Sequence, residues 1–314
     1  MKAIKLFRIA GIQVYLSWWW FLLAIYEIQA RRGTYTVFGW NVAEYIALFA
    51  IVLTHEFGHA FATRQVGGTA DRIMLWPLGG VAYVDPPQRP GATLWAIAAG
   101  PLVNVALAPL LLIAISTAGP LGWSIFFGDI SAGSNLSSFL WQILRIDVGL
   151  FLFNILPIYP LDGGQILRSL LWFVMGRGKS LMAATIIGFL GLFGFLGLAL
   201  SNWSHGDEFN AGWLLLIAFY AGSNCWTAFK AAKAMLRQEK IPRRMGLKCP
   251  SCGMAPPIGN YWACANCHQQ FDTFETAGRC PHCATQYNTT TCLDCRRSAP
   301  QHEWTAGDWA GAAR

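Results

Sequence analysis

Six long apolar stretches alternate with short polar segments along the first 230 residues of the chain. They cover residues 13–29, 42–62, 93–117, 144–163, 181–201 and 211–230. Each stretch contains about 20 residues, the length that an α-helix rising 1.5 Å per residue needs to cross the hydrocarbon core of a bilayer. The pattern predicts six transmembrane helices, and an even number of crossings leaves both ends of this region on one side of the membrane.

The composition agrees with a membrane protein whose charge is concentrated at one end. Hydrophobic residues make up 54% of the 314 residues and charged residues only 12%. The chain has 23 basic and 16 acidic side chains, of which 11 basic and 6 acidic lie after residue 229. We therefore predict a six-span domain at residues 1–230, a basic juxtamembrane linker at 231–248 and a separate cysteine-rich domain at 249–314.

Basic residues are distributed unevenly between the predicted loops. They gather before the first stretch and after the second and fourth: Lys2, Lys5, Arg8, Arg64, Arg72, Arg89, Arg168, Arg177 and Lys179. The loops 118–138 and 202–210 contain no lysine or arginine, and Arg31 and Arg32 are the exception to the pattern. Because short cytoplasmic loops carry the excess of lysine and arginine, we predict a multi-pass membrane protein with both termini in the cytoplasm.

The second apolar stretch contains ionisable residues in the sequence LTHEFGHA, residues 53–60. In a helix, His55 and His59 lie on one face and can bind one metal ion, while Glu56 can reach a water molecule at that ion. Such a cluster in lipid costs several kcal/mol unless it is paired or binds an ion, which disfavours a chance occurrence. The motif predicts a zinc site in a polar cavity, where Glu56 accepts the proton of an activated water.

A catalytic zinc ion needs three protein ligands besides water, so a third must come from another segment. The acids and histidines in or beside other stretches are Glu27, Glu44, Asp147, Asp162 and His205. Asp162 is the best placed, because it and His59 both lie near the predicted cytoplasmic ends of their spans. The adjacent glycines, Gly163 and Gly164, would allow the backbone to bend and pack closely there.

Two signatures make the chain resemble a known family. His55-Glu56-Phe57-Gly58-His59 is followed by NILPIYPLDGG, residues 154–164, which is similar to the Asn-x-x-Pro-x-x-x-Leu-Asp-Gly signature of site-2 proteases. The segments PLGGVAYV (77–84) and AAGPLVN (98–104) are also similar to this family, so the resemblance covers most of residues 1–230. The family consists of intramembrane zinc metalloproteases.

The resemblance implies roles for particular residues. Asp162 falls at the position of the third zinc ligand, and Asn154 at that of an asparagine that hydrogen-bonds the substrate or the oxyanion. Gly79 and Gly80 fall in a membrane-associated hairpin whose free edge binds an unwound substrate as an added strand. From the residues alone, Asn154 could instead bridge two helices, and the glycine pair belongs to an apolar loop.

Eight cysteines after residue 248 form four C-x-x-C pairs, a pattern typical of zinc sites in a reducing compartment. They are Cys249, Cys252, Cys264, Cys267, Cys280, Cys283, Cys292 and Cys295. Joining the first pair to the second, and the third to the fourth, predicts two structural zinc sites in ribbon-like folds. His268 and His282 lie beside cysteines and could replace a thiolate, although exposure to solvent is favoured for both.

The whole pattern predicts an all-α polytopic membrane protein with a small membrane-associated hairpin and a small cytoplasmic zinc-ribbon domain. With one catalytic and two structural Zn²⁺ ions, it is expected to hydrolyse peptide bonds in or near transmembrane segments of membrane proteins. The expected partners are the lipid bilayer, a transmembrane protein substrate and a cytoplasmic protein bound by the tail.

Two alternatives remain open from the sequence. A proteolytically inactive zinc-binding scaffold would need no general base, so Glu56 argues against it. A membrane-anchored protein that binds nucleic acid through residues 240–314 would leave the His-Glu-His cluster without a purpose, which disfavours a nucleic-acid partner. The substrate, the activating signal and the oligomeric state are not predicted.

Overall fold

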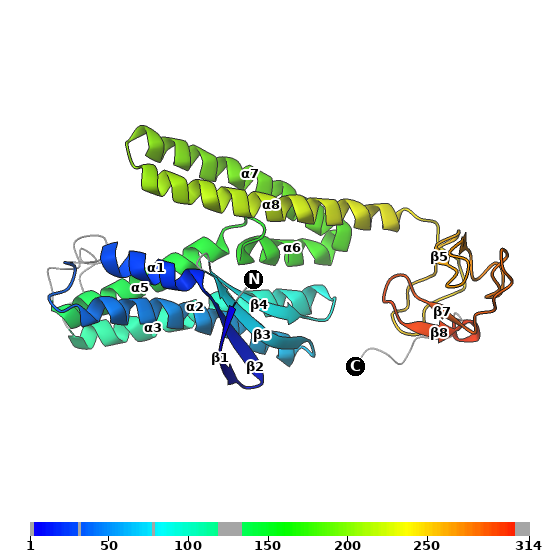
Figure 1. Ribbon diagram of the computed structural model, residues 1–314, viewed down its shortest axis with the longest axis horizontal. Coiled ribbons are helices and arrows are strands. Elements are labelled where there is room, and N and C mark those ends of the chain that lie inside the picture. Colours follow the sequence, from blue (N-terminus) through cyan, green and yellow to red (C-terminus); the bar gives the residue numbers. More distant parts are fainter. Residues whose placement is uncertain (1–2, 31–32, 77–78, 119–133, 305–314) are drawn as a thin grey trace. The chain divides into compact units, whose positions relative to one another are not determined.

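The computed structural model describes residues 3–30, 33–76, 79–118 and 134–304 (Figure 1). The chain divides into two compact units, Met1–Lys233 and Ala234–Arg314. The first unit contains the apolar stretches, and the second contains all eight paired cysteines.

The first unit is mainly helical. Its helices are α1 (Trp19–Ala30), α2 (Gly39–Gln65), α3 (Pro90–Ala118), α5 (Asn135–Ile155), α6 (Asp162–Met175), α7 (Arg177–Ser204) and α8 (Glu208–Glu239), which extends into the second unit. Among the described residues, four helices are long and apolar enough to cross a membrane: α2, α3, α5 and α7. The chain is therefore a mostly helical membrane protein, but the predicted count of six transmembrane helices is not confirmed.

Three predicted spans depart from the structure. Residues 211–230 lie inside the long helix α8, which is not among the four, and the other two departures have clear physical reasons. Residues 13–29 contain a strand and the 12-residue helix α1, which is only about 18 Å long and too short for a hydrocarbon core of about 30 Å. Residues 144–163 are not one helix, because α5 ends at Ile155 and α6 begins at Asp162. Proline has no N–H to continue a helix, and Pro157 and Pro160 lie in the break.

A four-stranded sheet makes the all-α prediction wrong. Its strands are β1 (Ala3–Ile9), β2 (Ile12–Ser17), β3 (Thr69–Trp76) and β4 (Gly79–Asp85), in the order β1-β2-β3-β4. The strands β2 and β3 are parallel, and the other two pairs are antiparallel. The described part of the predicted hairpin, residues 79–84, thus lies in β4, the edge strand of a larger sheet that pairs with β3.

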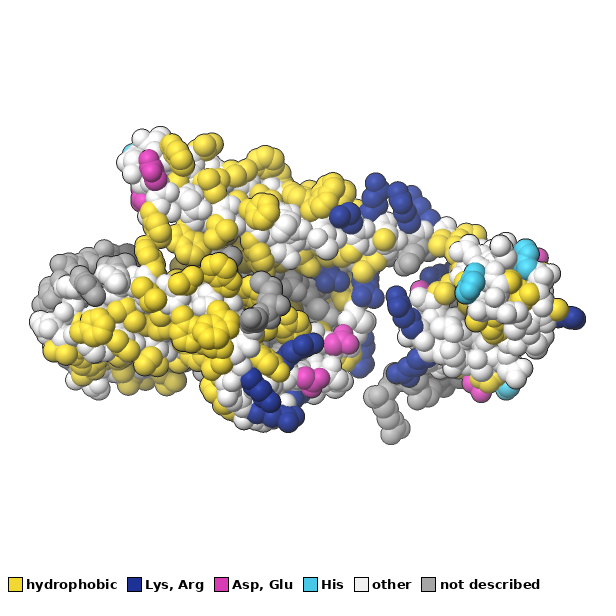
Figure 2. All heavy atoms as spheres, in the orientation of Figure 1, with side chains coloured by type: hydrophobic (Ala, Val, Ile, Leu, Met, Phe, Trp, Pro, Cys, Tyr) yellow, Lys and Arg dark blue, Asp and Glu magenta, His cyan; other side chains and the backbone are white. Residues whose placement is uncertain are grey.

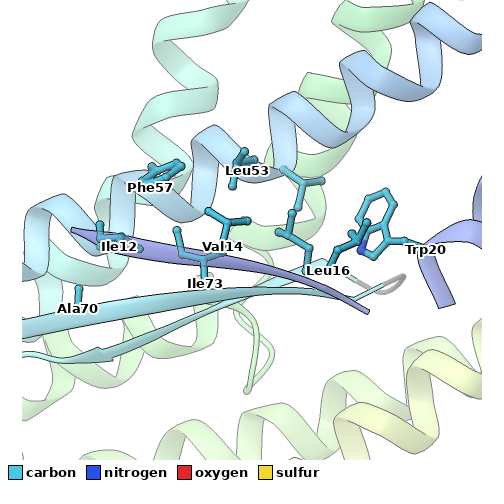
Figure 3. Packing of buried hydrophobic residues seen from close by; sticks show 11 residues of the cluster. Ile12, Val14, Leu16, Trp20, Leu53, Phe57, Ala70 and Ile73 are labelled. Atoms are coloured by element: carbon cyan, nitrogen blue, oxygen red, sulfur yellow. The ribbon is translucent and has the colours of Figure 1, made fainter. Parts of the chain in front are cut away.

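The sheet packs against α2 through a hydrophobic core. Ile12, Val14 and Ile73 are fully buried and face Leu53 and Phe57 of the helix (Figure 3). Burying side chains of this size stabilises the fold by roughly 1.5–3 kcal/mol each, as an upper estimate. Because His55 and Glu56 lie between Leu53 and Phe57 in the chain, this core holds the polar part of α2 in place.

The helices of the first unit expose an apolar outer surface. Leu110 of α3, Phe193 of α7 and Phe219 of α8 are 63%, 70% and 76% exposed. Figure 2 shows that hydrophobic side chains cover much of the visible face over these helices. An apolar surface of this extent is unfavourable in water and suits contact with lipid.

The second unit is built from two short hairpins, β5 (Trp262–Ala263) with β6 (Gln270–Phe271) and β7 (Thr289–Thr291) with β8 (Ser298–Pro300), followed by the 3-10 turn Gln301–Glu303. Each C-x-x-C pair is followed by a residue with positive φ whose N–H donates to the carbonyl of the first cysteine. These residues are Gly253, His268, Ala284 and Arg296. The same tight turn therefore presents all four cysteine pairs.

Part of the predicted linker belongs to this second fold. Arg243 donates two hydrogen bonds to the carboxylate of Asp294, and Arg244 donates one to Asp272 at 2.5 Å. Asp272 is only 2% exposed and also accepts the N–H groups of Gly259 and other backbone neighbours. The basic segment thus stabilises the cysteine-rich unit instead of merely connecting it.

Candidate active site and metal centres

The structure brings together two histidines of α2 and the first residue of α6. The Nε2 atom of His55 lies 3.1 Å from Nε2 of His59 and 3.1 Å from Oδ2 of Asp162. His59 Nε2 lies 3.4 Å from the same carboxylate oxygen. His55 and His59 are only 3% and 6% exposed, so the three groups form a closely spaced, buried cluster.

This cluster has the chemistry of a zinc site. The Nδ1 atom of His59 lies 2.9 Å from the carbonyl oxygen of Ala96, to which it can only donate, so the neutral imidazole presents the lone pair of Nε2 to the cluster. Three ligands of a tetrahedral zinc ion at about 2.0–2.1 Å would lie roughly 3.3 Å apart. The observed separations of 3.1–3.4 Å fit that geometry, and a cation relieves the repulsion between the converging acceptors.

One face of α3 surrounds the two histidines. Ala96, Gly100 and Asn104 lie four residues apart, so they occupy the same side of the helix. The Oδ1 atom of Asn104 lies 2.7 Å from Nδ1 of His55, and a Cβ atom added to Gly100 would lie 2.2 Å from Nε2 of His59. Gly100 therefore leaves room for an imidazole that any larger residue would displace.

Glu56 is held beside this cluster by the sheet. It is 6% exposed, and its Oε2 atom accepts the backbone N–H of Ala82 in β4 at 2.8 Å. A Cβ atom added to Gly80 would lie 2.3 Å from Cγ of Glu56, so this glycine allows the strand to approach the carboxylate. The edge strand thus orients the carboxylate that the motif predicts as a base.

A cavity of about 310 Å³ joins the remaining predicted residues to the cluster. Its lining includes His55, Glu56, His59, Asp162, Asn154, Gly79 and Gly80. The predicted polar cavity is therefore present, and all the residues predicted for this site line it. Their individual catalytic roles remain predictions.

The other candidates for a third ligand lie elsewhere or serve another contact. Glu44 accepts the hydroxyl of Tyr35 at 2.7 Å, and the exposed His205 bonds the carbonyl of Ser201. Asp147 accepts the side-chain amide of Asn104 and lies behind His55, and the side chain of Glu27 is outside the described residues. Sequence reasoning missed Asn104 and Gly100, although their spacing along one face of an apolar helix was a usable signal.

The tail cysteines form two groups of four, but the predicted pairing of successive C-x-x-C segments is wrong. Cys249, Cys252, Cys292 and Cys295 form the outer quartet, and Cys264, Cys267, Cys280 and Cys283 form the inner quartet. The prediction failed because four identical motifs carry no information about which pairs meet in space. His268 and His282 are exposed and outside both groups.

Both quartets have the spacing of closed zinc sites. Sulfur atoms of the outer quartet lie 3.8 Å apart in two pairs, and those of the inner quartet lie 3.5 and 3.7 Å apart. A tetrahedral site with Zn–S distances of about 2.3 Å has sulfur atoms roughly 3.8 Å apart. Four thiolates complete such a site and leave no open position, as in structural zinc centres.

Comparisons with known proteins support the assignment of a zinc site to the His55, His59 and Asp162 cluster of the first unit. The model of peptidase family M50 matches residues 43–120 and 115–198. A zinc metalloprotease of Methanocaldococcus jannaschii is 34% identical over 186 residues, which are 59% of this chain and 50% of that protein. Rip3 of Mycobacterium tuberculosis, provisionally named a zinc metalloprotease, is 29% identical over 249 residues, 74% of this chain and 58% of that protein.

A solved structure agrees with these relatives. The site-2 protease from Methanocaldococcus jannaschii aligns with a TM-score of 0.50 and 27% identity, covering 73% of this chain and 95% of that one. The chain spans only about half to three-fifths of the length of the two curated relatives. The matched segments contain the whole His55-Glu56-His59 motif and Asp162, and the chain belongs to peptidase family M50, the site-2 proteases.

Proposed function

We propose that the chain is an intramembrane zinc metalloprotease that hydrolyses peptide bonds in or near the transmembrane segments of membrane proteins. The observation that carries the proposal is the convergence of His55, His59 and Asp162 on one buried point, with Glu56 in the same cavity. A zinc-binding scaffold would have no use for a carboxylate oriented towards that cavity by a backbone N–H.

The residues divide the chemistry between them. Zinc bound by His55, His59 and Asp162 would polarise the peptide carbonyl and make a water molecule acidic enough to attack near neutral pH. Glu56 accepts the proton of that water and passes it to the departing amine nitrogen. Asn154 lines the same cavity, and its side-chain amide donates a hydrogen bond to the carbonyl oxygen as negative charge develops there.

The edge strand β4 provides a surface for an extended substrate. Gly79 and Gly80 line the cavity, and the strand pairs only with β3 among the described elements. A transmembrane segment must unwind locally before its peptide bonds become accessible, and an unwound segment can then pair with a free strand edge. The apolar outer surface of the surrounding helices favours substrates that arrive through the lipid.

The proposal includes an orientation in the membrane, with both termini in the cytoplasm. Arg64, near the C-terminal end of α2, donates hydrogen bonds to the carbonyls of Ala10 and Ala70, so the β1–β2 turn lies at this end of the helix. The basic N-terminal strand and Arg64 are therefore on one side, which agrees with a cytoplasmic location for both. A reporter protein that functions only in the cytoplasm should therefore be active when it is fused after residue 314. A reporter that functions only outside the cytoplasm should be inactive at the same position.

We propose that the cysteine-rich unit recognises a partner protein or regulates the protease. It would hold two structural zinc ions, in addition to the one catalytic ion of the membrane unit. Its sites have no open position for catalysis, and its exposed side chains include Met245, Ile258 and Tyr261, which are 99%, 45% and 43% exposed. Apolar side chains on the surface favour a protein partner over nucleic acid. The proposed domain limits are 1–230 for the membrane domain and 249–314 for the cysteine-rich domain, and the segment 231–248 contributes Arg243 and Arg244 to the cysteine-rich unit.

The test compares two glutamates of the same helix. Glu56→Gln should retain zinc but abolish cleavage, so that membrane proteins shortened by the parent accumulate at full length in cells that express the variant. Glu44→Gln is the matched control, because Glu44 is also 6% exposed on α2 but is hydrogen-bonded to Tyr35 and does not line the cavity. Quantitative proteomics of membranes measures the cleavage of membrane proteins in cells that express either variant. Persistent cleavage by Glu56→Gln would exclude Glu56 as the base.

A further inference from the structure

Three buried polar side chains form a chain of hydrogen bonds behind the metal ligands. His55 of α2 lies 2.7 Å from Oδ1 of Asn104 in α3, and Nδ2 of Asn104 donates to Oδ1 of Asp147 in α5 at 2.7 Å. The exposed fractions of His55, Asn104 and Asp147 are 3%, 1% and 1%. These hydrogen bonds thus connect α2, α3 and α5, three of the helices that are long and apolar enough to cross the membrane.

The donor and acceptor groups along these hydrogen bonds decide which nitrogen of His55 carries the proton. The NH₂ group of Asn104 faces a carboxyl group, so its carbonyl oxygen must face the imidazole. An amide oxygen can only accept, and Nδ1 of His55 must therefore donate. Nε2 is left with a free lone pair directed at His59 and Asp162, where the metal would bind.

The structure shows no competing use for these two polar groups. The second carboxyl oxygen of Asp147, Oδ2, is buried and meets no hydrogen-bond donor among the described residues. Neither Asn104 nor Asp147 lines the cavity, so neither can touch a substrate there. Placing polar side chains at membrane depth costs free energy, so an interaction with another group must offset the cost of burying Asn104 and Asp147.

We infer that Asn104 is a positioning residue for the metal ligand His55, and that Asp147 sets the orientation of the Asn104 amide. The inference rests on the proposed function, because it assumes that His55 binds zinc. Partners of this kind fix the tautomer and the ring orientation of a metal-binding histidine, and their loss typically weakens metal binding 10–100-fold.

The test uses variants that exchange the two side chains without changing their size. Asn104→Asp places two carboxyl groups together, and Asp147→Asn allows the Asn104 amide to face either way. The double variant Asn104→Asp/Asp147→Asn restores a consistent chain, because the carboxylate at position 104 accepts from both His55 and the amide at position 147. Thr185→Val is the control, since Thr185 is fully buried in α7 and, among the described residues, its hydroxyl donates to the carbonyl of Met182 in the same helix.

The measurement is zinc binding to the purified full-length chain, titrated against a chelator of known affinity and compared with His55→Ala, which lacks the site. Asn104→Asp should weaken this binding about 10–100-fold. Asp147→Asn should weaken it only about twofold, because about half of the Asn104 amides still turn their oxygen to His55. The double variant should return to within about threefold of the parent, and Thr185→Val should match the parent. Parent-like binding by Asn104→Asp, or a double variant that binds zinc no better than Asn104→Asp, would overturn the inference.

Failure of the proposed function gives a different result. If the parent binds no more zinc than His55→Ala, there is no metal site in the membrane unit, and both the proposed function and the inference fall. If the zinc results are as expected but the parent cleaves no membrane protein, only the proteolytic activity is wrong. Thermal unfolding of each variant, measured in parallel, separates a loss of zinc affinity from a loss of fold.

Discussion

Replacing Gly100 by alanine should remove one zinc ligand through a single methyl group. That Cβ atom would lie 2.2 Å from Nε2 and 2.4 Å from Cε1 of His59, whereas ordinary contacts begin at 3.4 Å. The imidazole would have to move by about 1.2 Å, several times the roughly 0.2 Å tolerance of a zinc–ligand distance. The movement would also break the 2.9 Å hydrogen bond between His59 and Ala96.

The expected loss can be bounded from these numbers. Changes to the residues behind a ligand already weaken metal binding 10–100-fold, so displacement of the ligand itself should cost about 100-fold or more, roughly 2.7 kcal/mol. Gly194→Ala is the matched control, because Gly194 lies inside the long helix α7 and a Cβ atom there meets no described atom within 4 Å. In the helix interior this control should stabilise the chain by about 0.5–1 kcal/mol.

The assay counts zinc per chain by mass spectrometry after dialysis against a chelator, together with cleavage of membrane proteins in cells. Gly100→Ala should hold one zinc ion fewer than the parent and lose cleavage, while Gly194→Ala keeps both. A Gly100→Ala chain with the zinc content and cleavage of the parent would show that His59 is not placed as described.

Three further predictions concern the metal ligands and the tail. Asp162→Ala should lose the same single zinc ion as His55→Ala, and the double variant of both should lose no more, because each removes one ligand of one site; zinc analysis measures all three. Cys249→Ser/Cys295→Ser should lose one tail zinc ion and Cys249→Ser/Cys264→Ser two; the reverse result would mean that successive motifs pair after all. Asp272→Asn should destabilise the tail unit by about 2 kcal/mol in chemical denaturation at pH 7, because it removes the charged hydrogen-bond partner of the partly buried Arg244. Burial alone would raise the pKa of Asp272, but the Gly259 amide and Arg244 outweigh it and lower the pKa, so the difference between parent and variant should shrink as the pH falls below about 4.

The sequence predicts the metal cluster better than the fold that holds it. His55 and His59 follow from helical spacing, and the resemblance implies Asp162, because these residues are rare in apolar segments. Asn104 and Gly100 were not predicted, since their importance depends on the packing of α3 against α2, which a local pattern does not contain. The same is true of the N–H of Ala82, which only the position of β4 brings to Glu56.

The strand β2 shows why the sheet was missed. Ile12, Val14 and Leu16 alternate with less buried residues, as expected for a strand with one buried face. The chain then continues directly into the aromatic sequence of α1, so the two elements together have the length and hydrophobicity of one span. A window of about 20 residues averages over this boundary and hides the alternation.

The nested arrangement of the tail cysteines also sets a time order for folding as the chain is synthesised. The inner quartet joins Cys267 to Cys280, 13 residues apart, whereas the outer quartet joins Cys252 to Cys292, 40 residues apart. At about 5–20 residues per second, the first cysteine pair waits roughly 2–8 s for its partner. During that interval its thiols are unpaired while the inner site can already close, so the last residues of the tail complete the fold that the first residues began.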